Sequence, residues 1–473
     1  MIEIAWTLLR LAAGLGSIEL AGYALLVLVL PRRASFTSLE RLSLAFGLGS
    51  LGITLWMLAL TFFQVTYSLA TIFGPWLLLA FPGGWLAWKR GWGQEDCRSL
   101  MAGGRLLVTF GLRSDFSKLE KLLFFLLLFA FGFGFLRAVS YPVWAWDALS
   151  TWGLKAKAFY LAQGLDMSKF EAHNYYPNLV PLLMAYLYFW LGGVADHLVQ
   201  AVFPLWGGGI VVLFFGFLRR LGVKRAEALG AAAFLVLNGA TWMTHLFIAY
   251  ADLPLTYYQL AAAGLLYLWL WEEAPAGSGP LIACLCGGMA WSKYEGWPLV
   301  MITFLAAGLT LIWLNPPRVG KRLLSLALMG LGGWFFTLPW RLFMGFQGLE
   351  VGGDHIGGFY FPQFFLGVWY VFKALIWIPY FGLLWPTIFV SFILSGWSIF
   401  RTPLIFLWLF VGGNLAAIAL AYALVPASPA EFPMYVRATV DRLLLHLAPA
   451  SALIFSVPLA SPGSISAARR DFI

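Results

Sequence analysis

The chain has 473 residues, of which 61% are hydrophobic, 18% aromatic and only 11% charged. A soluble domain has about 25% charged residues, so this composition excludes a soluble fold and indicates a polytopic membrane protein. The net charge of +9 does not indicate a nucleic-acid partner. The basic residues are mostly scattered in short loops beside apolar runs, where they set topology and meet anionic membrane lipids.

Apolar runs that can cross a bilayer, at roughly 20 residues each, recur about thirteen times along the chain. They cover roughly residues 4–30, 42–63, 68–88, 121–138, 197–217, 227–247, 253–271, 280–292, 298–314, 322–343, 366–395, 402–424 and 443–460. The predicted fold is therefore all-α, a polytopic integral membrane protein with about thirteen transmembrane helices.

Lysine and arginine in the short loops predict the orientation of these helices, because cytoplasmic loops carry an excess of both. The alternation works throughout if the apolar stretch Leu179–Leu191, which has Pro177 and Pro181 at its start, does not cross. Residues 139–196 then form one large external loop with interfacial helices. Four other polar segments also fall outside, at residues 250–254, 292–298, 345–363 and 425–442.

The stretch from Tyr141 to Lys157 is unusual for a connecting loop, because it carries one acid, two lysines and three tryptophans. Tryptophan and tyrosine favour the membrane–water boundary, so Asp147 is a lone carboxylate among aromatic rings at that boundary. It lies just ahead of a predicted helix start at Ser150 or Thr151. Asp147 is therefore either a general base toward a hydroxyl, or a helix cap or buried ion-pair partner.

Several cations fall on the external side, which the topology rule expects to be poor in them: Lys155, Lys157, Lys293, Arg437 and Arg442, with Arg137 and Arg341 near the outer ends of their spans. A charge misplaced near the bilayer costs a few kcal/mol unless it is paired or hydrated. Beside the external acids Asp147, Asp252, Glu295 and Asp354, these cations indicate a site for an anionic group such as a lipid phosphate. The alternative is ion pairing that only stabilises the loops.

Asp252 precedes Pro254 at the head of a helix, so it is either an N-cap or a site residue. Lys293 and Glu295 do not share a helix face, but in a turn they can converge on one ligand. His355 stands in a glycine-rich loop that could close over a substrate. No Cys/His spacing favours zinc and no Gly-rich phosphate loop is present, so we expect no cofactor; a divalent cation is possible but not indicated.

These motifs together resemble the GT-C glycosyltransferases that use polyprenyl-phosphate-linked sugars, such as protein O-mannosyltransferases and the aminoarabinose transferases of lipid A. The resemblance covers roughly residues 120–450. It rests on Trp146-Asp147-Ala148, which is similar to the family's catalytic acid, and on Asn174–Leu183, Arg219-Arg220-Leu221-Gly222, Tyr250-Ala251-Asp252-Leu253-Pro254, Ser292-Lys293-Tyr294-Glu295-Gly296 and the Arg-containing motif Asp441–Pro449, which resembles one that heads a late helix.

The resemblance implies an inverting transfer of a sugar from a polyprenyl-phosphate donor to a hydroxyl of a lipid, glycan or protein acceptor. The reaction would take place on the outer face of a bacterial inner membrane. Asp147 would deprotonate the acceptor. The phosphate would be held by Lys155, Lys157, Lys293, Arg437 and Arg442, and the sugar or acceptor by Trp146, Asp252, Glu295 and His355.

The chain also departs from the family pattern. About four spans precede the acidic loop, where family members usually have one, so residues 1–120 are read as additional helices and a cytoplasmic loop. Residues 121–460 are read as the catalytic module and 461–473 as a cytoplasmic tail. Asp147 is followed by Ala148, where many members have a second acid, which weakens any metal site built on that pair.

A transporter or flippase of a lipid-linked anion is the competing interpretation, since the same cations could line a path. Transporters tend to have repeated halves and charges at the membrane midplane. No internal repeat is visible here and the motifs lie at the ends of spans, which favours the enzyme. A structural subunit whose charges only pair internally is a third class, and it would tolerate single charge losses.

Overall fold

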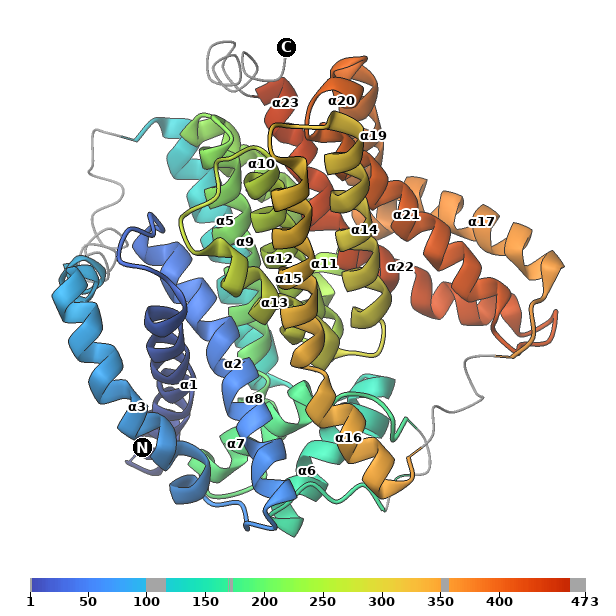
Figure 1. The fold of residues 1–473 in the computed structure, drawn as a ribbon. Coiled ribbons are helices and arrows are strands. Elements are labelled where there is room, and N and C mark those ends of the chain that lie inside the picture. The colour runs from blue at the N-terminus through green and yellow to red at the C-terminus, as the bar shows by residue number, and fades with distance from the viewer. Residues whose placement is uncertain (1, 99–115, 169, 171–172, 350–356, 460–473) are drawn as a thin grey trace.

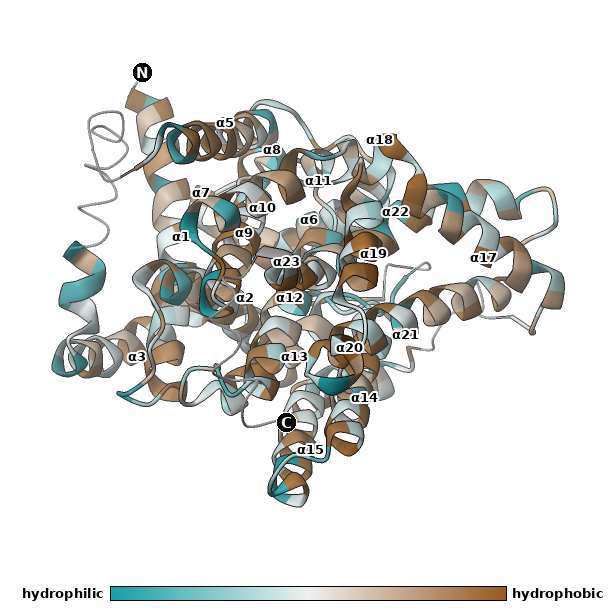
Figure 2. Ribbon diagram, turned by 90° about the horizontal axis from the view of Figure 1, so that it is seen from above, coloured by the Kyte–Doolittle hydropathy of each residue, from teal (hydrophilic) through white to brown (hydrophobic). Residues whose placement is uncertain are grey.

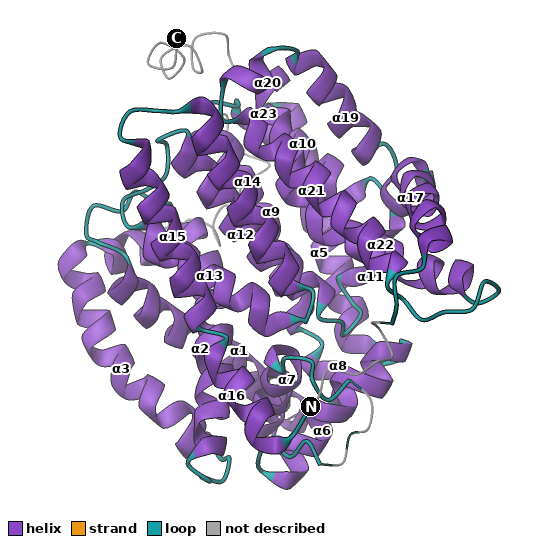
Figure 3. Ribbon diagram, turned by 45° about the vertical axis from the view of Figure 1, so that its right-hand side comes forward, coloured by secondary structure: helices purple, strands orange, loops and turns teal. Residues whose placement is uncertain are grey.

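The computed structural model describes residues 2–98, 116–168, 170, 173–349 and 357–459, and every regular element in these ranges is a helix (Figures 1 and 3). The first half of the chain forms α1 (Ile2–Val29), α2 (Ser38–Phe62), α3 (Leu69–Arg90), α5 (Lys118–Ser140), the π-helical turn η2 (Ala148–Trp152), α6 (Gly153–Ala162), α7 (Leu179–Leu191), α8 (Asp196–Val199), α9 (Val202–Arg220), α10 (Arg225–Leu237) and α11 (Ala240–His245).

The second half forms α12 (Asp252–Leu270), α13 (Ser278–Ser292), α14 (Gly296–Leu314), α15 (Val319–Phe335), α16 (Leu338–Gln347), α17 (Phe361–Ile376), α18 (Ile378–Phe381), α19 (Leu384–Ser395), α20 (Ser398–Arg401), α21 (Leu404–Ala423), α22 (Phe432–Ser451), the 3₁₀ turn η3 (Ala452–Phe455) and α23 (Ser456–Leu459). The chain is thus an all-α protein of the multi-pass membrane class in the part described.

Nine helical segments in the described part of the chain are long and apolar enough to cross a membrane. They are Ile2–Val29, Ser38–Phe62, Leu69–Arg90, Lys118–Ser140, Asp196–Arg220, Gly296–Leu314, Val319–Gln347, Leu404–Ala423 and Phe432–Phe455. Each corresponds to one of the thirteen predicted spans.

The four other predicted spans differ for local reasons. The run 227–247 is divided into α10 and α11, and the run 366–395 is divided into α17, α18 and α19. Helix α13 has only 15 residues. Helix α12 has 19 residues but carries a buried aspartate, a glutamine and three tyrosines, so its composition is less apolar. The run 280–292 is short and the run 366–395 is long enough to bend, as their lengths in the sequence indicate, whereas nothing in the apolar pattern marks the break within 227–247.

Helix α12 is the centre of the bundle. All of its residues except Trp269 are buried, and it packs against α9, α13 and α22. The outermost helix is α3, whose most apolar 18-residue stretch is only 11% buried, against 72% for α2. Hydrophobic residues therefore cover outward faces as well as the core (Figure 2), as expected of helices that contact lipid.

Helices α1 and α2 approach closely because glycine lies at their crossing. A Cβ atom on Gly22 would meet the carbonyl oxygen of Ala45, and one on Gly49 would meet that of Ile18. Small residues allow such backbone contact between membrane helices. The first helices are thereby joined to the rest of the bundle, because α2 also packs on α7, α9 and α13.

The end of the bundle that holds the α9–α10 turn is fastened by ion pairs between helices. Glu40 closes the capping box of α2 with Thr37 and accepts bonds of 3.0 and 2.6 Å from Arg220. Glu120 closes the box of α5 and pairs with Arg225 at 2.6 Å. Two further pairs, Arg41 with Asp96 and Arg322 with Glu272, also join separate segments. Each of these acids has a structural partner.

The opposite end holds α6, α7 and α16, at the bottom of Figure 1. Helix α7, the predicted non-crossing stretch, has 13 residues and packs against α1, α2 and α6. Helices α17 and α21 project to one side in Figures 1 and 2. In the segment between α3 and α5, residues 92–98 are helical, and residues 99–115 lie outside the described ranges.

Candidate active site

Asp252 is a fully buried carboxylate in the first turn of α12 and the centre of a charged cluster. Its Oδ1 accepts hydrogen bonds from Lys293 Nζ at 3.0 Å and His446 Nε2 at 2.9 Å. Its Oδ2 accepts from Nε and Nη2 of Arg442 at 3.1 and 2.9 Å. Four donors from three residues thus converge on one carboxylate, and none of them is a backbone N–H of α12, so Asp252 does not cap its helix.

Arg442 links Asp252 to the acidic loop. Its Nη1 lies 2.6 Å from Oδ2 of Asp147, while its Nε and Nη2 face Asp252. Its guanidinium also lies over the ring of Tyr250, 4.5 Å from the centroid. Burial, followed by the Asp147 carboxylate, raises the pKa of the Tyr250 phenol. A single guanidinium therefore joins α22, α12 and the loop after α5.

Lys293 and Glu295 occupy the turn between α13 and α14, with Nζ and Oε1 2.9 Å apart. The two side chains meet in this turn as an ion pair, and their predicted convergence on one ligand stays a prediction. The turn is tight because Gly296 follows it: a Cβ there would meet the carbonyl oxygen of Met289. Burial tends to raise the pKa of Glu295, but the adjacent Lys293 ammonium outweighs burial, and the pKa is lowered.

We call Asp147, Asp252, Lys293, Glu295, Arg442 and His446 the Asp252 cluster. Aromatic side chains from the acidic loop region pack beside it. The ring of Tyr176 lies 5.8 Å from that of Trp152 and 6.4 Å from that of Tyr294, the residue between Lys293 and Glu295. These contacts place aromatic rings beside the Lys293–Glu295 turn.

Asp147 stands where a short helical segment begins. Helical backbone starts at Trp146, earlier than the predicted Ser150 or Thr151, and continues through η2 into α6. The carboxylate makes no capping hydrogen bond and is 33% exposed. Of the alternatives that the sequence left open for Asp147, helix capping is wrong, and ion pairing with Arg442 is observed.

Other predicted site residues lie apart from the cluster. Lys155 is buried and donates to the His173 carbonyl oxygen at 2.5 Å; burial lowers its pKa to about 7. Lys157 pairs with Asp196 at 2.6 Å. Arg437 is exposed and stands five residues before Arg442 on α22. Trp146 is 79% exposed beside Asp147, and His355 lies outside the described residues.

The position of Arg442 within its helix corrects the prediction. Residues 425–442 were expected to be an external segment with Arg442 near the head of a helix. Helix α22 instead begins at Phe432, so Arg442 lies ten residues into it. The side chain of Arg442 faces the interior of the protein, where Asp252 neutralises the guanidinium.

The sequence analysis did not single out His446, although it belongs to the Arg-containing motif. It follows Arg442 by four residues, so both side chains lie on one helix face, and that spacing was the available signal. His245 was also missed. Its Nδ1 lies 2.7 Å from the Thr241 carbonyl oxygen, which can only accept, so Nδ1 carries the proton. Nε2 is buried without a partner in the described part of the chain.

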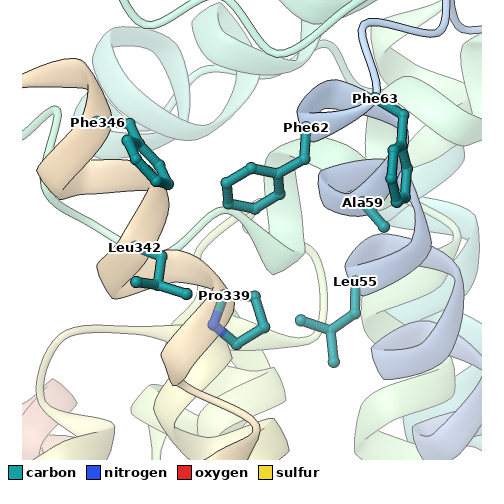
Figure 4. A pocket seen from close by; sticks show the side chains of 7 residues that line it. All are labelled: Leu55, Ala59, Phe62, Phe63, Pro339, Leu342 and Phe346. Carbon is teal, nitrogen blue, oxygen red and sulfur yellow. The ribbon is translucent and has the colours of Figure 1, made fainter.

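A separate apolar pocket of about 420 Å³ lies between α2 and α16 (Figure 4). It is lined by Leu55, Ala59, Phe62, Phe63, Pro339, Leu342 and Phe346, and none of these belongs to the Asp252 cluster. Uncharged walls cannot supply acid–base or phosphate chemistry. We therefore place the candidate active site at the Asp252 cluster.

The cluster contains two basic side chains, Lys293 and Arg442. Its carboxylates range from Asp252, which is fully buried, to Asp147, which is 33% exposed. Such an arrangement can bind an anion and position a hydroxyl next to a base. Among the described residues, no group of three or more His, Cys, Asp or Glu side chains is arranged to hold a metal ion.

The chain was compared with protein-family models, with curated proteins and with solved structures, and none of them matches it.

Proposed function

We propose that the protein is an inverting GT-C-type glycosyltransferase, which moves a sugar from a polyprenyl-phosphate donor to an acceptor hydroxyl. The observation that carries the proposal is the convergence on Asp252. Residues from the acidic loop, α12, the Lys293–Glu295 turn and α22 are separated by up to 295 positions (Asp147 to Arg442), yet they meet through ion pairs and hydrogen bonds. These are the positions on which the resemblance rests.

In this proposal Asp147 is the general base. It takes the proton from the acceptor hydroxyl while the hydroxyl oxygen forms a bond to the anomeric carbon. The bond from that carbon to the phosphate oxygen breaks, and its electron pair stays on the phosphate. Arg442 and Lys293 stabilise the charge that develops there. Asp252 holds both cations in place, and Glu295 and the exposed Trp146 ring are available to the sugar or acceptor.

Lys155, Lys157 and Arg437 have lesser roles in the refined proposal than in the sequence analysis. Lys155 and Lys157 already bond the His173 carbonyl and Asp196, and Arg437 is more than one helical turn away from Arg442. The phosphate is therefore assigned to Lys293 and Arg442.

The proposal includes the topology. The chain crosses a bacterial inner membrane about thirteen times, with α10, α12, α13 and the α17–α19 segment completing the spans. The Asp252 cluster faces the outer side, because the loops rich in lysine and arginine are assigned to the cytoplasm. The donor would be a lipid in the outer leaflet, and the acceptor a lipid, glycan or protein.

The test is mass spectrometry of lipid-linked sugars and surface glycans from cells with wild type, a deletion, Asp147→Asn or Asp196→Asn. Asp196 is the control because it also lies in an ion pair of 2.6 Å in the predicted external region. We expect the deletion and Asp147→Asn to lose one sugar from an acceptor and to accumulate the donor, and Asp196→Asn to match wild type. Unchanged glycans in Asp147→Asn, with a defect in the deletion alone, would favour a transporter or scaffold.

A further inference from the structure

Lys293 and Arg442, the cations of the Asp252 cluster, each have two carboxylate partners, one fully buried and one partly exposed. Arg442 bonds Asp252, which is fully buried, and Asp147, whose side chain is 33% exposed. Lys293 bonds Asp252 and also Glu295, whose side chain is 29% exposed. We call Asp147 and Glu295 the rim carboxylates. The same pairing of one buried and one rim acid thus occurs twice, on two different elements.

The bonds from Lys293 and Arg442 to Asp252 are harder to exchange than their bonds to the rim carboxylates. Asp252 accepts four hydrogen bonds with both of its oxygens, and because its carboxylate is fully buried, loss of these donors would leave a buried charge uncompensated. Asp147 holds Arg442 through Nη1 only, from the start of a π-helical turn. Glu295 uses only Oε1 on Lys293, and its Oε2 is buried with no hydrogen-bond partner in the described part of the chain.

The charges also argue against a preformed anion site. Lys293 and Arg442 carry two positive charges, and Asp147, Asp252 and Glu295 together carry three negative charges when ionised. An incoming phosphate would meet net negative charge unless a rim carboxylate withdraws. Coulomb repulsion between unit charges a few ångströms apart is large enough at a partly buried site to oppose binding.

We infer that the rim carboxylates occupy the anion site in the free protein, and that a phosphate monoester or diester displaces them on binding. The phosphate oxygens take Nη1 of Arg442 and Nζ of Lys293, while Asp252 keeps its bonds to both cations. Asp147 then leaves its guanidinium and is free to take the proton of the acceptor hydroxyl at the moment when the donor is in place. The inference rests on the proposed function for the identity of the ligand as a lipid phosphate.

The exchange has a distinctive consequence: removing the charge of a rim carboxylate tightens phosphate binding although it abolishes or impairs transfer. We would titrate the purified full-length protein in detergent with farnesyl phosphate and, separately, with inorganic phosphate, using isothermal titration calorimetry. Asp147→Asn and Glu295→Gln are the test variants. Asp196→Asn is the matched control, and Asp252→Asn removes the fixed partner.

We expect each test variant to bind farnesyl phosphate about tenfold more tightly than wild type. Asp196→Asn should match wild type and Asp252→Asn should bind more weakly. Tightening for inorganic phosphate as well would assign the exchange to the phosphate group itself, and tightening for farnesyl phosphate alone would assign it to a membrane lipid. Unchanged or weaker binding in both test variants would overturn the inference, since it would make the rim carboxylates supports of the cations.

Failure of this inference can be separated from failure of the proposed function. If Asp147→Asn binds phosphate more tightly and cellular glycans are unchanged, the exchange stands and the transferase is rejected. If the glycan is lost while binding weakens, the transferase stands and the exchange is rejected. If Asp147→Asn does not fold, Glu295→Gln decides, because it acts on Lys293 from a separate turn.

Discussion

The two ends of helix α12 carry ion pairs of different kinds. Beyond the last turn of α12, Glu272 is 72% exposed and pairs with Arg322. At the same end of the bundle Glu40 pairs with Arg220 and Glu120 with Arg225, and each of these two acids completes the capping box of its own helix. In its first turn, Asp252 is fully buried and holds three donor side chains. In the described part of the chain, Arg220 and Arg322 each pair with a single acid, whereas Lys293 and Arg442 of the Asp252 cluster each pair with two.

The difference separates stability from function. A one-to-one pair with capping bonds has no group left over for a ligand. A shared cation can exchange one partner for another while it keeps the rest. Substitutions at the two ends should therefore change different measurements, and the following predictions are ordered by the size of the expected effect.

The largest effect should come from Asp252→Asn. The change removes the carboxylate that Lys293, which is buried, and Arg442, which is 14% exposed, share as a counter-charge. Breaking a buried ion pair in this way typically costs about 3–5 kcal/mol of unfolding free energy. Chemical denaturation in detergent, followed by tryptophan fluorescence, measures it. Glu272→Gln at the other end of the same helix is the control, with an expected loss under about 1 kcal/mol because that side chain is exposed. Equal losses for the two variants would contradict the distinction drawn here.

An intermediate loss of stability, with transfer intact, is expected for Glu40→Gln. Glu40 is buried, but an amide retains one acceptor for the capping box or for Arg220. Weakened capping and the loss of one charge-assisted bond should cost about 1–3 kcal/mol. Transfer per folded molecule, measured on isolated membranes, should equal that of wild type. A folded Glu40→Gln protein without transfer would show that the α9–α10 end takes part in function.

Lys155 should give a smaller effect that depends on pH. Burial lowers its pKa to about 7, while the pKa in the unfolded chain stays near the ordinary 10.5. Between these values the unfolded chain holds a proton that the folded protein lacks, so stability should rise as the pH is raised from 7 to 10.5. Comparison of melting temperatures of wild type and Lys155→Met over this range isolates the contribution. An equal rise in both proteins would assign it to other groups.

The smallest effect is expected for Lys157→Ala. Lys157 is 38% exposed and Asp196 is 25% exposed, and partly exposed pairs contribute under about 1 kcal/mol. Both stability and transfer should stay close to wild type. Loss of transfer in a stable Lys157→Ala protein would bring this residue back into the phosphate site that the sequence analysis assigned to it.

The sequence predicted the helical membrane class and singled out most residues of the Asp252 cluster, but it did not predict how these residues contact one another. Charge bias alone assigned Asp147, Asp252, Lys293, Glu295 and Arg442 to one side, because cytoplasmic loops carry an excess of lysine and arginine. It did not reveal that Arg442 lies within a helix, since apolarity drops wherever a helix turns polar groups inward. Helix breaks such as the one between α10 and α11 depend on tertiary contacts: a Cβ on Gly239 would meet the Tyr380 carbonyl oxygen.

His446 and His245 show a second limit of sequence reasoning. His446 was within reach, because its spacing from Arg442 is that of neighbours on a helix face. The setting of His245 depends on α11, a helix of six residues that also packs on α18 and α22. No local pattern in the sequence marks that contact.

The length of the π-helical turn Ala148–Trp152 determines the direction in which the Asp147 side chain points. A π turn contains one residue more than the α-helix that could replace it. Because the π turn already takes up that residue, one more residue, added in α-helical geometry between Asp147 and α6, would rotate everything before it by about 100° around the helix axis. The carboxylate would then point away from Arg442, although every residue of the cluster would still be present. The length of this segment is thus as much a part of the site as its side chains.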